Sequence, residues 1–346
     1  MSINLETGVQ FILFLQGLGD WLVVPMQFFS FLGKEEFLIL VVPALYWSIN
    51  PGLGIRVGAI LLLADGLNYF LKLAFHSPRP FWYSREVRPL ALETSFGAPS
   101  GHAQDAAAAW GLAAVKVRRW WAFVAAGLVI FLIGLSRAYL GVHFFSDVVI
   151  GWLIGLTGLG VFLSLEAPFI SWFKRLKLES RLLAVFGFSL AMIAVGSLIR
   201  LSLSDWQLPA TWLENAAAAF PAEDAPNPFS LDGLITTQAT LFGLAAGAIW
   251  LFSQKEYQVS GPLWQRLARY LVGLIGVIVL WLGLGAVFPR GENLLAYSLR
   301  YLRYALIGVW ITALAPLLFS RLGLVQIESK LRTKKHPRRQ RKSAAR

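Results

Sequence analysis

Long apolar segments, separated by short polar and basic breaks, run through most of the chain. Six of them approach the roughly 20 residues that a helix needs to cross a bilayer. They are residues 120–135, 144–165, 182–198, 234–252, 270–288 and 302–319. Because so many apolar segments alternate with basic breaks, the pattern predicts an all-α fold, a polytopic bundle of transmembrane helices.

The finer pattern predicts about nine spans. They cover residues 36–49, 53–75, 101–117, 120–139, 142–165, 181–203, 234–252, 267–288 and 300–320. Residues 3–31 are apolar but are broken by Gly17, Gly19, Asp20 and Pro25, so one or two short interfacial helices are expected there. The span at 101–117 is weakly hydrophobic, because Gln104 and Asp105 lie inside it.

Composition agrees with a membrane protein, since 57% of the residues are hydrophobic and 14% are charged. Soluble domains carry about 25% charged residues. The chain has no cysteine, which excludes disulfides, thiolate metal sites and a cysteine nucleophile. The N-terminus has no basic region followed by an apolar core, so no cleaved secretory signal is predicted.

Positive charge is distributed unevenly between the two sides of this layout. The predicted loops after the first, third, fifth and seventh spans, together with the C-terminal tail, hold 21 of the 31 Lys and Arg residues. The positive-inside rule makes that side cytoplasmic. Residues 204–233, on the opposite side, contain five acidic residues and no Lys or Arg. The N-terminus is therefore expected outside and the tail inside.

The net charge of +12 raises the question of nucleic acid as a partner. Ten of the basic residues lie from Arg321 onward, in a tail without alternating aromatic residues. Such a tail is typical of attraction to anionic lipid headgroups, so the bilayer is the expected partner and nucleic acid is not. No protein partner is predicted.

A weak boundary between two parts of the chain is expected at residues 166–180, where the chain leaves the membrane between two spans. We expect a catalytic membrane core at 1–165, further transmembrane helices at 166–321 and a basic tail at 322–346.

Ionisable residues near a bilayer usually mark function, and here they form three clusters. Lys72 and Arg79 follow the second span, Ser100 to His102 begin the third, and Arg137 to Asp147 join the fourth to the fifth. Because the third and fourth spans make a round trip, all three clusters return to the extracytoplasmic face. The layout therefore predicts one site.

These residue types suit phosphate binding. Lys72, Arg79 and Arg137 offer donors for the phosphate oxygens. Ser100 and Gly101, at the start of a helix, add an anion site with the backbone N–H groups there. No carboxylate cluster stands ready for a divalent metal, so we expect neither metal nor cofactor and predict metal-independent turnover.

The two histidines suit nucleophilic and acid–base roles. His143 and Asp147 lie four residues apart on one helical face. A carboxylate there fixes the tautomer of the imidazole and leaves its other nitrogen free to attack phosphorus. His102 is expected to protonate the leaving alkoxide.

The same residues form three ordered motifs. They are Lys72-x6-Arg79-Pro80, Pro99-Ser100-Gly101-His102 and Ser136-Arg137-x5-His143-x3-Asp147. The set resembles the signature of the type 2 phosphatidic acid phosphatase superfamily, and the resemblance covers roughly residues 50–165. It implies His143 as nucleophile, His102 as acid and base, and Lys72, Arg79, Ser100, Gly101 and Arg137 as phosphate ligands. The extended C-terminal half resembles glucose-6-phosphatase and the sphingosine-1-phosphate phosphatases in architecture.

The function predicted is hydrolysis of a lipid phosphate monoester or pyrophosphate on the extracytoplasmic side. A phosphotransferase using the same intermediate is one alternative, and a non-catalytic lipid-binding or transport protein is another. A haloperoxidase, also within this superfamily, is disfavoured by the many spans. Which phosphate is the substrate stays open, a soluble sugar phosphate included.

Other polar residues near the motifs have less defined expectations. Asp105 is expected to pair with Lys72, to support His102, or to be a solvated pore residue. Arg85 and Arg88, in the loop above the site, are weighed as headgroup ligands.

Overall fold

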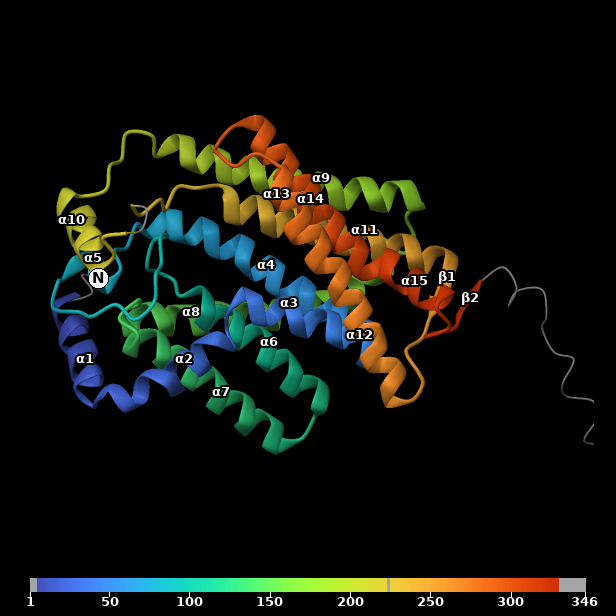
Figure 1. The fold of residues 1–346 in the computed structure, drawn as a ribbon, viewed down its shortest axis with the longest axis horizontal. Helices are drawn as coiled ribbons and strands as arrows, with labels where there is room; N and C mark the ends of the chain where they lie inside the picture. The colour runs from blue at the N-terminus through green and yellow to red at the C-terminus, as the bar shows by residue number, and fades with distance from the viewer. Residues whose placement is uncertain (1–4, 223–224, 330–346) are drawn as a thin grey trace, which may run out of the picture. The chain divides into compact units, whose positions relative to one another are not determined.

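The computed structural model describes residues 5–222 and 225–329, and this part of the chain is helical apart from one short strand pair (Figure 1). In chain order the elements are α1 (Leu5–Gly17), η1 (Asp20–Leu22), α2 (Val23–Phe31), α3 (Glu35–Ala44), η2 (Leu45–Ile49), α4 (Pro51–Phe75), α5 (Pro80–Tyr83), α6 (Gly101–Val117), α7 (Trp120–Tyr139), α8 (Phe145–Phe173), α9 (Leu178–Ser202), α10 (Ala210–Ala219), α11 (Asp232–Gln254), β1 (Lys255–Tyr257), α12 (Leu263–Ile278), η3 (Val279–Gly283), α13 (Leu284–Val287), α14 (Leu294–Val309), η4 (Trp310–Leu314), α15 (Ala315–Arg321) and β2 (Ile327–Ser329). The all-α prediction is confirmed.

Seven helical segments in the described residues are long and apolar enough to cross a membrane. An eighth is added if α1 and the helix after it, which meet at 90°, form one broken span. The predicted number of nine spans is not confirmed. The difference lies in α6, whose composition is too polar, and in the apolar helix at Ile39–Ile49, which is short. Most of the basic tail lies outside the described residues.

The chain forms two compact units. The first comprises residues 1–39, 59–172 and 190–238, and the second comprises 40–58, 173–189 and 239–346, within the described part of each. Several long helices contribute to both units.

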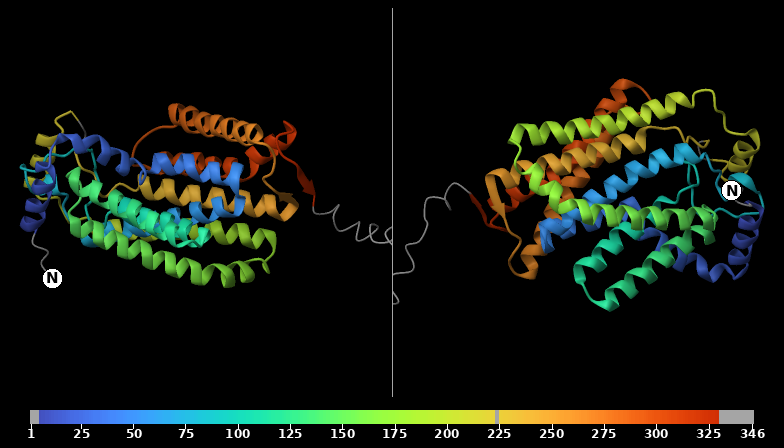
Figure 2. Two further views of the ribbon diagram at one scale, coloured as in Figure 1. Left: turned by 90° about the horizontal axis from the view of Figure 1, so that it is seen from below. Right: turned by 180° about the vertical axis from the view of Figure 1, so that it is seen from behind.

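In the first unit, α6 and α7 form an antiparallel pair, which the right-hand view of Figure 2 shows clearly. Arg118, at a φ of 57°, ends α6 in the left-handed conformation that commonly closes a helix, and α7 begins two residues later. Helix α2 packs along α7, and α10 packs on α5. The buried core of this unit gathers α1, the loop before α6 and the end of α7, around residues such as Phe81, Trp82 and Phe144.

Helices α6 and α8 approach each other closely at two glycines of α8. A Cβ placed on Gly151 would lie 2.5 Å from the carbonyl oxygen of Ser100, and one on Gly155 would lie 2.3 Å from that of Gln104. Small residues at such positions let two helix backbones come together. This contact places the start of α6 against the start of α8.

The second unit is held by ring N–H and O–H groups that bond to backbone carbonyls. Tyr46 Oη donates to Thr312 O at 2.9 Å, and Trp47 Nε1 donates to Ile311 O at 2.8 Å. These carbonyls belong to η4, a π-helical turn, where a widened backbone frees acceptors that a side chain then satisfies. Strands β1 and β2 pair antiparallel, with Lys255 opposite Ser329.

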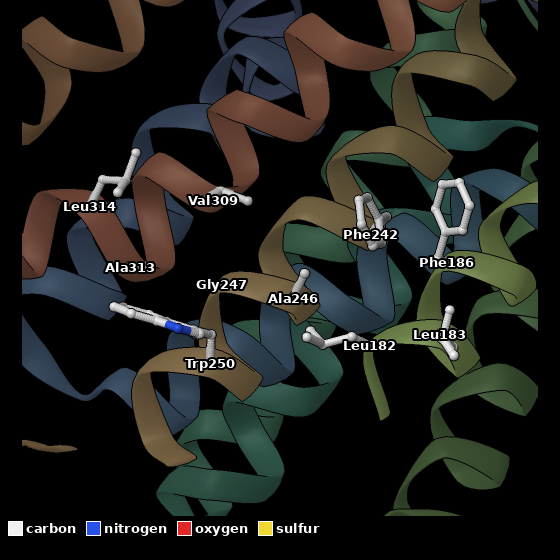
Figure 3. A pocket seen from close by; sticks show the side chains of 10 residues that line it. All are labelled: Leu182, Leu183, Phe186, Phe242, Ala246, Gly247, Trp250, Val309, Ala313 and Leu314. Atoms are coloured by element: carbon white, nitrogen blue, oxygen red, sulfur yellow. The ribbon is translucent and has the colours of Figure 1, made fainter. Parts of the chain in front are cut away.

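The second unit also contains a groove of about 610 Å³ between α9, α11 and α14, shown in Figure 3. Its lining is apolar, with Phe186, Phe242 and Trp250 among the residues that form it. No titratable side chain lines it, so the groove offers no group for acid–base or phosphate chemistry.

Candidate functional site

All eight residues singled out from the motifs lie in the first unit, at or near the ends of helices. Ser100 is the N-cap of α6, where its Oγ accepts from Ala103 N. Its backbone N–H donates to Asp147 O at 3.0 Å. This bond ties the second motif to the third, across the close contact of α6 and α8.

His143 is set by the turn after α7. Gly141 lies at a φ of +72°, and an added Cβ there would come within 2.8 Å of Arg88 O, so the turn requires glycine. The backbone N–H groups of Val142 and His143 both bond back to Arg137 O. The five residues between Arg137 and His143 therefore form one turn, which these two hydrogen bonds to Arg137 O close.

The two nitrogens of the His143 ring face different groups. Arg79 Nη1 lies 3.3 Å from Nε2, and Asp147 Oδ2 lies 3.5 Å from Nδ1. A guanidinium only donates hydrogen bonds, so Nε2 is the unprotonated nitrogen and Nδ1 carries the proton, facing the carboxylate. Asp147 Oδ2 is itself oriented by Phe144 N at 3.0 Å. Asp147 thus lies at ion-pair distance from His143, as predicted, but Nδ1 makes no hydrogen bond in the described structure. The predicted shared helical face is wrong, because α8 begins at Phe145 and His143 lies in the turn before it.

The ring is also held neutral. Burial lowers the pKa of His143 well below its usual 6.5, and the positive charges of Arg79 and Arg137 lower it further. His143 is 1% exposed. At neutral pH the ring keeps a lone pair on Nε2.

The three cations converge on one region. Arg79 and Arg137 are completely buried, although they lie 58 positions apart in the sequence. Arg79 Nη1 donates to Val142 O at 2.9 Å, beside the His143 ring, and Arg137 Nη1 donates to Ser30 Oγ at 2.6 Å. Arg137 Nε is buried without a hydrogen-bond partner in the described structure. A buried donor without an acceptor calls for a partner, and a bound anion is one that fits this cluster of positive charge.

His102 and Gly101 lie at the first turn of α6. His102 Nε2 is buried and has no hydrogen-bond partner among the described residues. The ring is within electrostatic reach of Arg137 and Lys72, and Gly33 lies directly behind it. The first N–H groups of α6 have no acceptor within the helix. The site therefore offers unpaired donors and one unpaired imidazole nitrogen.

Sequence reasoning missed two residues of the loop between α5 and α6. The Glu93 carboxylate bridges Arg79 and Arg137, and Ser95 Oγ accepts from Lys72 Nζ at 2.7 Å. Neither residue belongs to the three motifs. An acidic residue between two basic motifs was the available signal, but the sequence alone does not place that loop over the cations.

Several weaker expectations have other outcomes. Asp105 hydrogen-bonds Asp65, where a pairing with Lys72 was one expectation. Arg88 forms an ion pair with Asp20, and Arg85 Nε donates to Asn215 at 2.7 Å on α10. Both arginines thus have protein partners in this structure.

Comparison with known proteins places these residues in a family context. A model described as the PAP2 superfamily matches residues 53–170, and one described as the PAP2 superfamily phosphatase, transmembrane extension, matches 235–328. The first match spans every motif residue described above.

Individual proteins give the same picture. The chain is 31% identical to phosphatidylglycerophosphatase B of Bacillus subtilis (strain 168), over 39% of this chain and 71% of that protein. It is 28% identical to glucose-6-phosphatase 3 of Bos taurus, over 91% and 95%. It is 34% identical to sphingosine-1-phosphate phosphatase 2 of Homo sapiens, over 37% and 34%. The crystal structure of a transmembrane PAP2-type phosphatidylglycerolphosphate phosphatase from Bacillus subtilis aligns with a TM-score of 0.41 at 25% identity, covering 48% of this chain and 87% of that one.

Proposed function

Because the chain belongs to the PAP2 superfamily of multi-pass membrane phosphatases, we propose that it hydrolyses a lipid phosphate monoester or pyrophosphate through a phosphohistidine on His143. The observation that carries this proposal is the orientation of the His143 ring. Its Nε2 is unprotonated and lies among the cations, and its Nδ1 faces Asp147.

The first half-reaction transfers the phosphoryl group to the protein. Nε2 of His143 attacks phosphorus, the bond from phosphorus to the ester oxygen breaks, and His102 gives its proton to the departing alkoxide. Burial and Arg137 lower the pKa of His102 in the empty site, so His102 can donate only after the negatively charged substrate has favoured its protonated form. Asp147 stabilises the positive charge that develops on the ring. Lys72, Arg79 and Arg137 balance the charge on the phosphoryl oxygens, together with the N–H groups at the start of α6.

The second half-reaction returns the free enzyme. His102, now neutral, takes a proton from water, and the hydroxide oxygen attacks phosphorus as the bond to Nε2 breaks. Orthophosphate leaves, and His143 and His102 regain their starting protonation states.

A lipid substrate is supported by two of the relatives compared above, which are named for lipid phosphates. They share 31% and 34% identity with this chain over the matched segments. A sugar phosphate is the second candidate, because the match to glucose-6-phosphatase 3 extends over nearly the whole of both chains.

The decisive experiment measures phosphate release by the purified protein from phosphatidate, phosphatidylglycerol phosphate, a polyprenyl pyrophosphate, sphingosine 1-phosphate and glucose 6-phosphate. We expect release from a lipid phosphate in EDTA, and none from the His143→Ala variant. Labelled substrate quenched in alkali should leave an acid-labile label on wild type only. Equal release by wild type and variant would overturn the mechanism, and label transferred to a second lipid would indicate a phosphotransferase.

We also propose that the site faces the extracytoplasmic side. The chain has no cysteine, so a single introduced cysteine reports its own side of the membrane. In intact cells a membrane-impermeant maleimide should label Glu86→Cys, in the exposed loop above the site, and should spare Ser343→Cys in the tail. The reverse pattern would invert the proposed orientation.

A further inference from the structure

The segment Glu93–Ser95 contacts all three cations of the site. Ser95 Oγ accepts from Lys72 Nζ at 2.7 Å and from Arg79 Nη2 at 3.0 Å, and Ser95 O accepts from Arg79 Nε at 2.6 Å. Glu93 Oε2 accepts from Arg79 Nη2 at 3.2 Å, and its Oε1 accepts from Arg137 Nη2. One carboxylate thus bridges the two guanidinium groups with its two oxygens, as two phosphoryl oxygens would.

A count of donors shows what this bridge means for substrate binding. A guanidinium has five N–H groups. Arg79 directs them at Ser95 O, Val142 O, His143 Nε2, Ser95 Oγ and Glu93 Oε2, so all five are committed. A phosphoryl oxygen can therefore bind Arg79 only if one of these acceptors leaves.

Of these acceptors, Glu93 is the one suited to leave. Ser95 O and Val142 O are backbone atoms, and the Nε2 lone pair of His143 leaves Arg79 only when it attacks phosphorus. The Glu93 side chain is 24% exposed, whereas Arg79 and Arg137 are completely buried. Because Glu93 belongs to a loop that is open to solvent, its side chain can rotate out of the site toward the solvent.

The Glu93 carboxylate is negatively charged, as is the phosphoryl group that would displace it. Burial alone raises the pKa of Glu93, but Arg79 and Arg137, with His102 and Lys72, more than offset this and hold the pKa well below its usual range. Glu93 therefore stays ionised at every pH at which the enzyme would work, and it competes with a phosphate of like charge for the same donors.

We propose that the Glu93 carboxylate occupies the place of the phosphoryl oxygens in the empty site, and that substrate binding displaces it. This inference rests on the proposed function. Between turnovers Glu93 neutralises buried positive charge. After hydrolysis its return competes with orthophosphate and speeds product release.

The test compares Glu93→Gln with wild type, using orthophosphate itself as the probe. The amide has nearly the same shape but no charge, so it competes less well for the arginines. We expect the inhibition constant for orthophosphate to fall by about tenfold, the scale of one charge-assisted contact. KM should fall with it, and kcat should fall or stay unchanged because release slows. The matched control is Glu86→Gln, an exposed glutamate of the same loop, which should behave as wild type.

A purely structural role for Glu93 gives the opposite result. If the carboxylate only holds the arginines in position, Glu93→Gln will bind orthophosphate more weakly and KM will rise, which would overturn the inference. An unchanged inhibition constant would overturn it as well.

A second readout does not depend on activity. The rise in Tm that orthophosphate causes in the purified protein should be larger for Glu93→Gln than for wild type. If no substrate is hydrolysed but orthophosphate raises the Tm of Glu93→Gln more than that of wild type, the proposed function fails and the competition of Glu93 with phosphate stands. If wild type is active and the variant's Tm rise is no larger, the inference fails alone.

Discussion

The contact of α6 with α8 predicts that one added methyl group on α8 impairs the enzyme. In Gly155→Ala the new Cβ would lie 2.3 Å from Gln104 O and 2.8 Å from Ala107 Cβ. An ordinary contact of carbon with carbonyl oxygen is about 3.3 Å or more, so the helices must separate by roughly 1 Å. The obstacle is a backbone carbonyl, which cannot rotate away as a long side chain would.

The size of the effect follows from this geometry. Overpacking of this kind costs about 1–3 kcal/mol. Separation of α6 from α8 also moves Ser100 and His102 away from the His143 nucleophile, since the bond from Ser100 N to Asp147 O spans the same contact. A displacement of about 1 Å can lower a rate by roughly 100-fold. We expect a Tm several degrees lower and a kcat/KM lower by one to two orders of magnitude, about 10- to 100-fold.

The assay is thermal unfolding and substrate hydrolysis of the purified variant in detergent. Gly160→Ala is the matched control, because it lies on the same helix and nothing is within 4 Å of its added Cβ. Alanine favours a helix over glycine, so this control should have a wild-type or slightly higher Tm and full activity. Wild-type Tm and kcat/KM in Gly155→Ala, or equal damage in Gly160→Ala, would refute the reasoning.

Three further predictions concern charged groups of the first unit. Asp147→Asn should lower kcat about 100-fold or more with a small change in KM, because the imidazolium formed during attack loses its carboxylate while the acceptor for Phe144 N is kept. A raised KM with an unchanged kcat would contradict this. NMR of ¹³C-labelled histidine can follow the His143 ring, whose signal is assigned by its absence in His143→Ala. The signal should remain that of the neutral ring as the pH falls through 6.5 and should titrate only at lower pH. A midpoint at or above 6.5 would show that the ring is neither desolvated nor surrounded by positive charge. That lowered pKa means that the unfolded chain takes up the proton first, so stability from this group is lost as the pH falls below about 6.5. Arg88→Ala, which removes an exposed ion pair with Asp20, should leave activity unchanged and shift Tm by no more than about 1–2 °C; a large loss of activity would instead support a role in headgroup binding.

The sequence by itself determined the helices and the motif residues, because both are set by local information. Hydrophobic length and polar breaks gave the predicted spans at 101–117 and 120–139, and α6 and α7 have those same bounds. The proximity of His143 and Asp147 follows from their short spacing of four residues, although His143 lies in the turn before α8 and not on the helix itself. These features need no knowledge of what packs against them.

Only the tertiary structure decided which groups complete the site. Glu93 and Ser95 contact the cations because of the path of a loop, and Ser30 reaches Arg137 from a helix more than a hundred residues earlier. Neither contact has a periodicity or spacing that a sequence pattern could reveal. The number of spans also stayed open, because α6 has 17 residues and contains Gln104 and Asp105, and so lacks the length and hydropathy of a span. Contacts between distant segments depend on packing, and packing is a property of the folded chain as a whole.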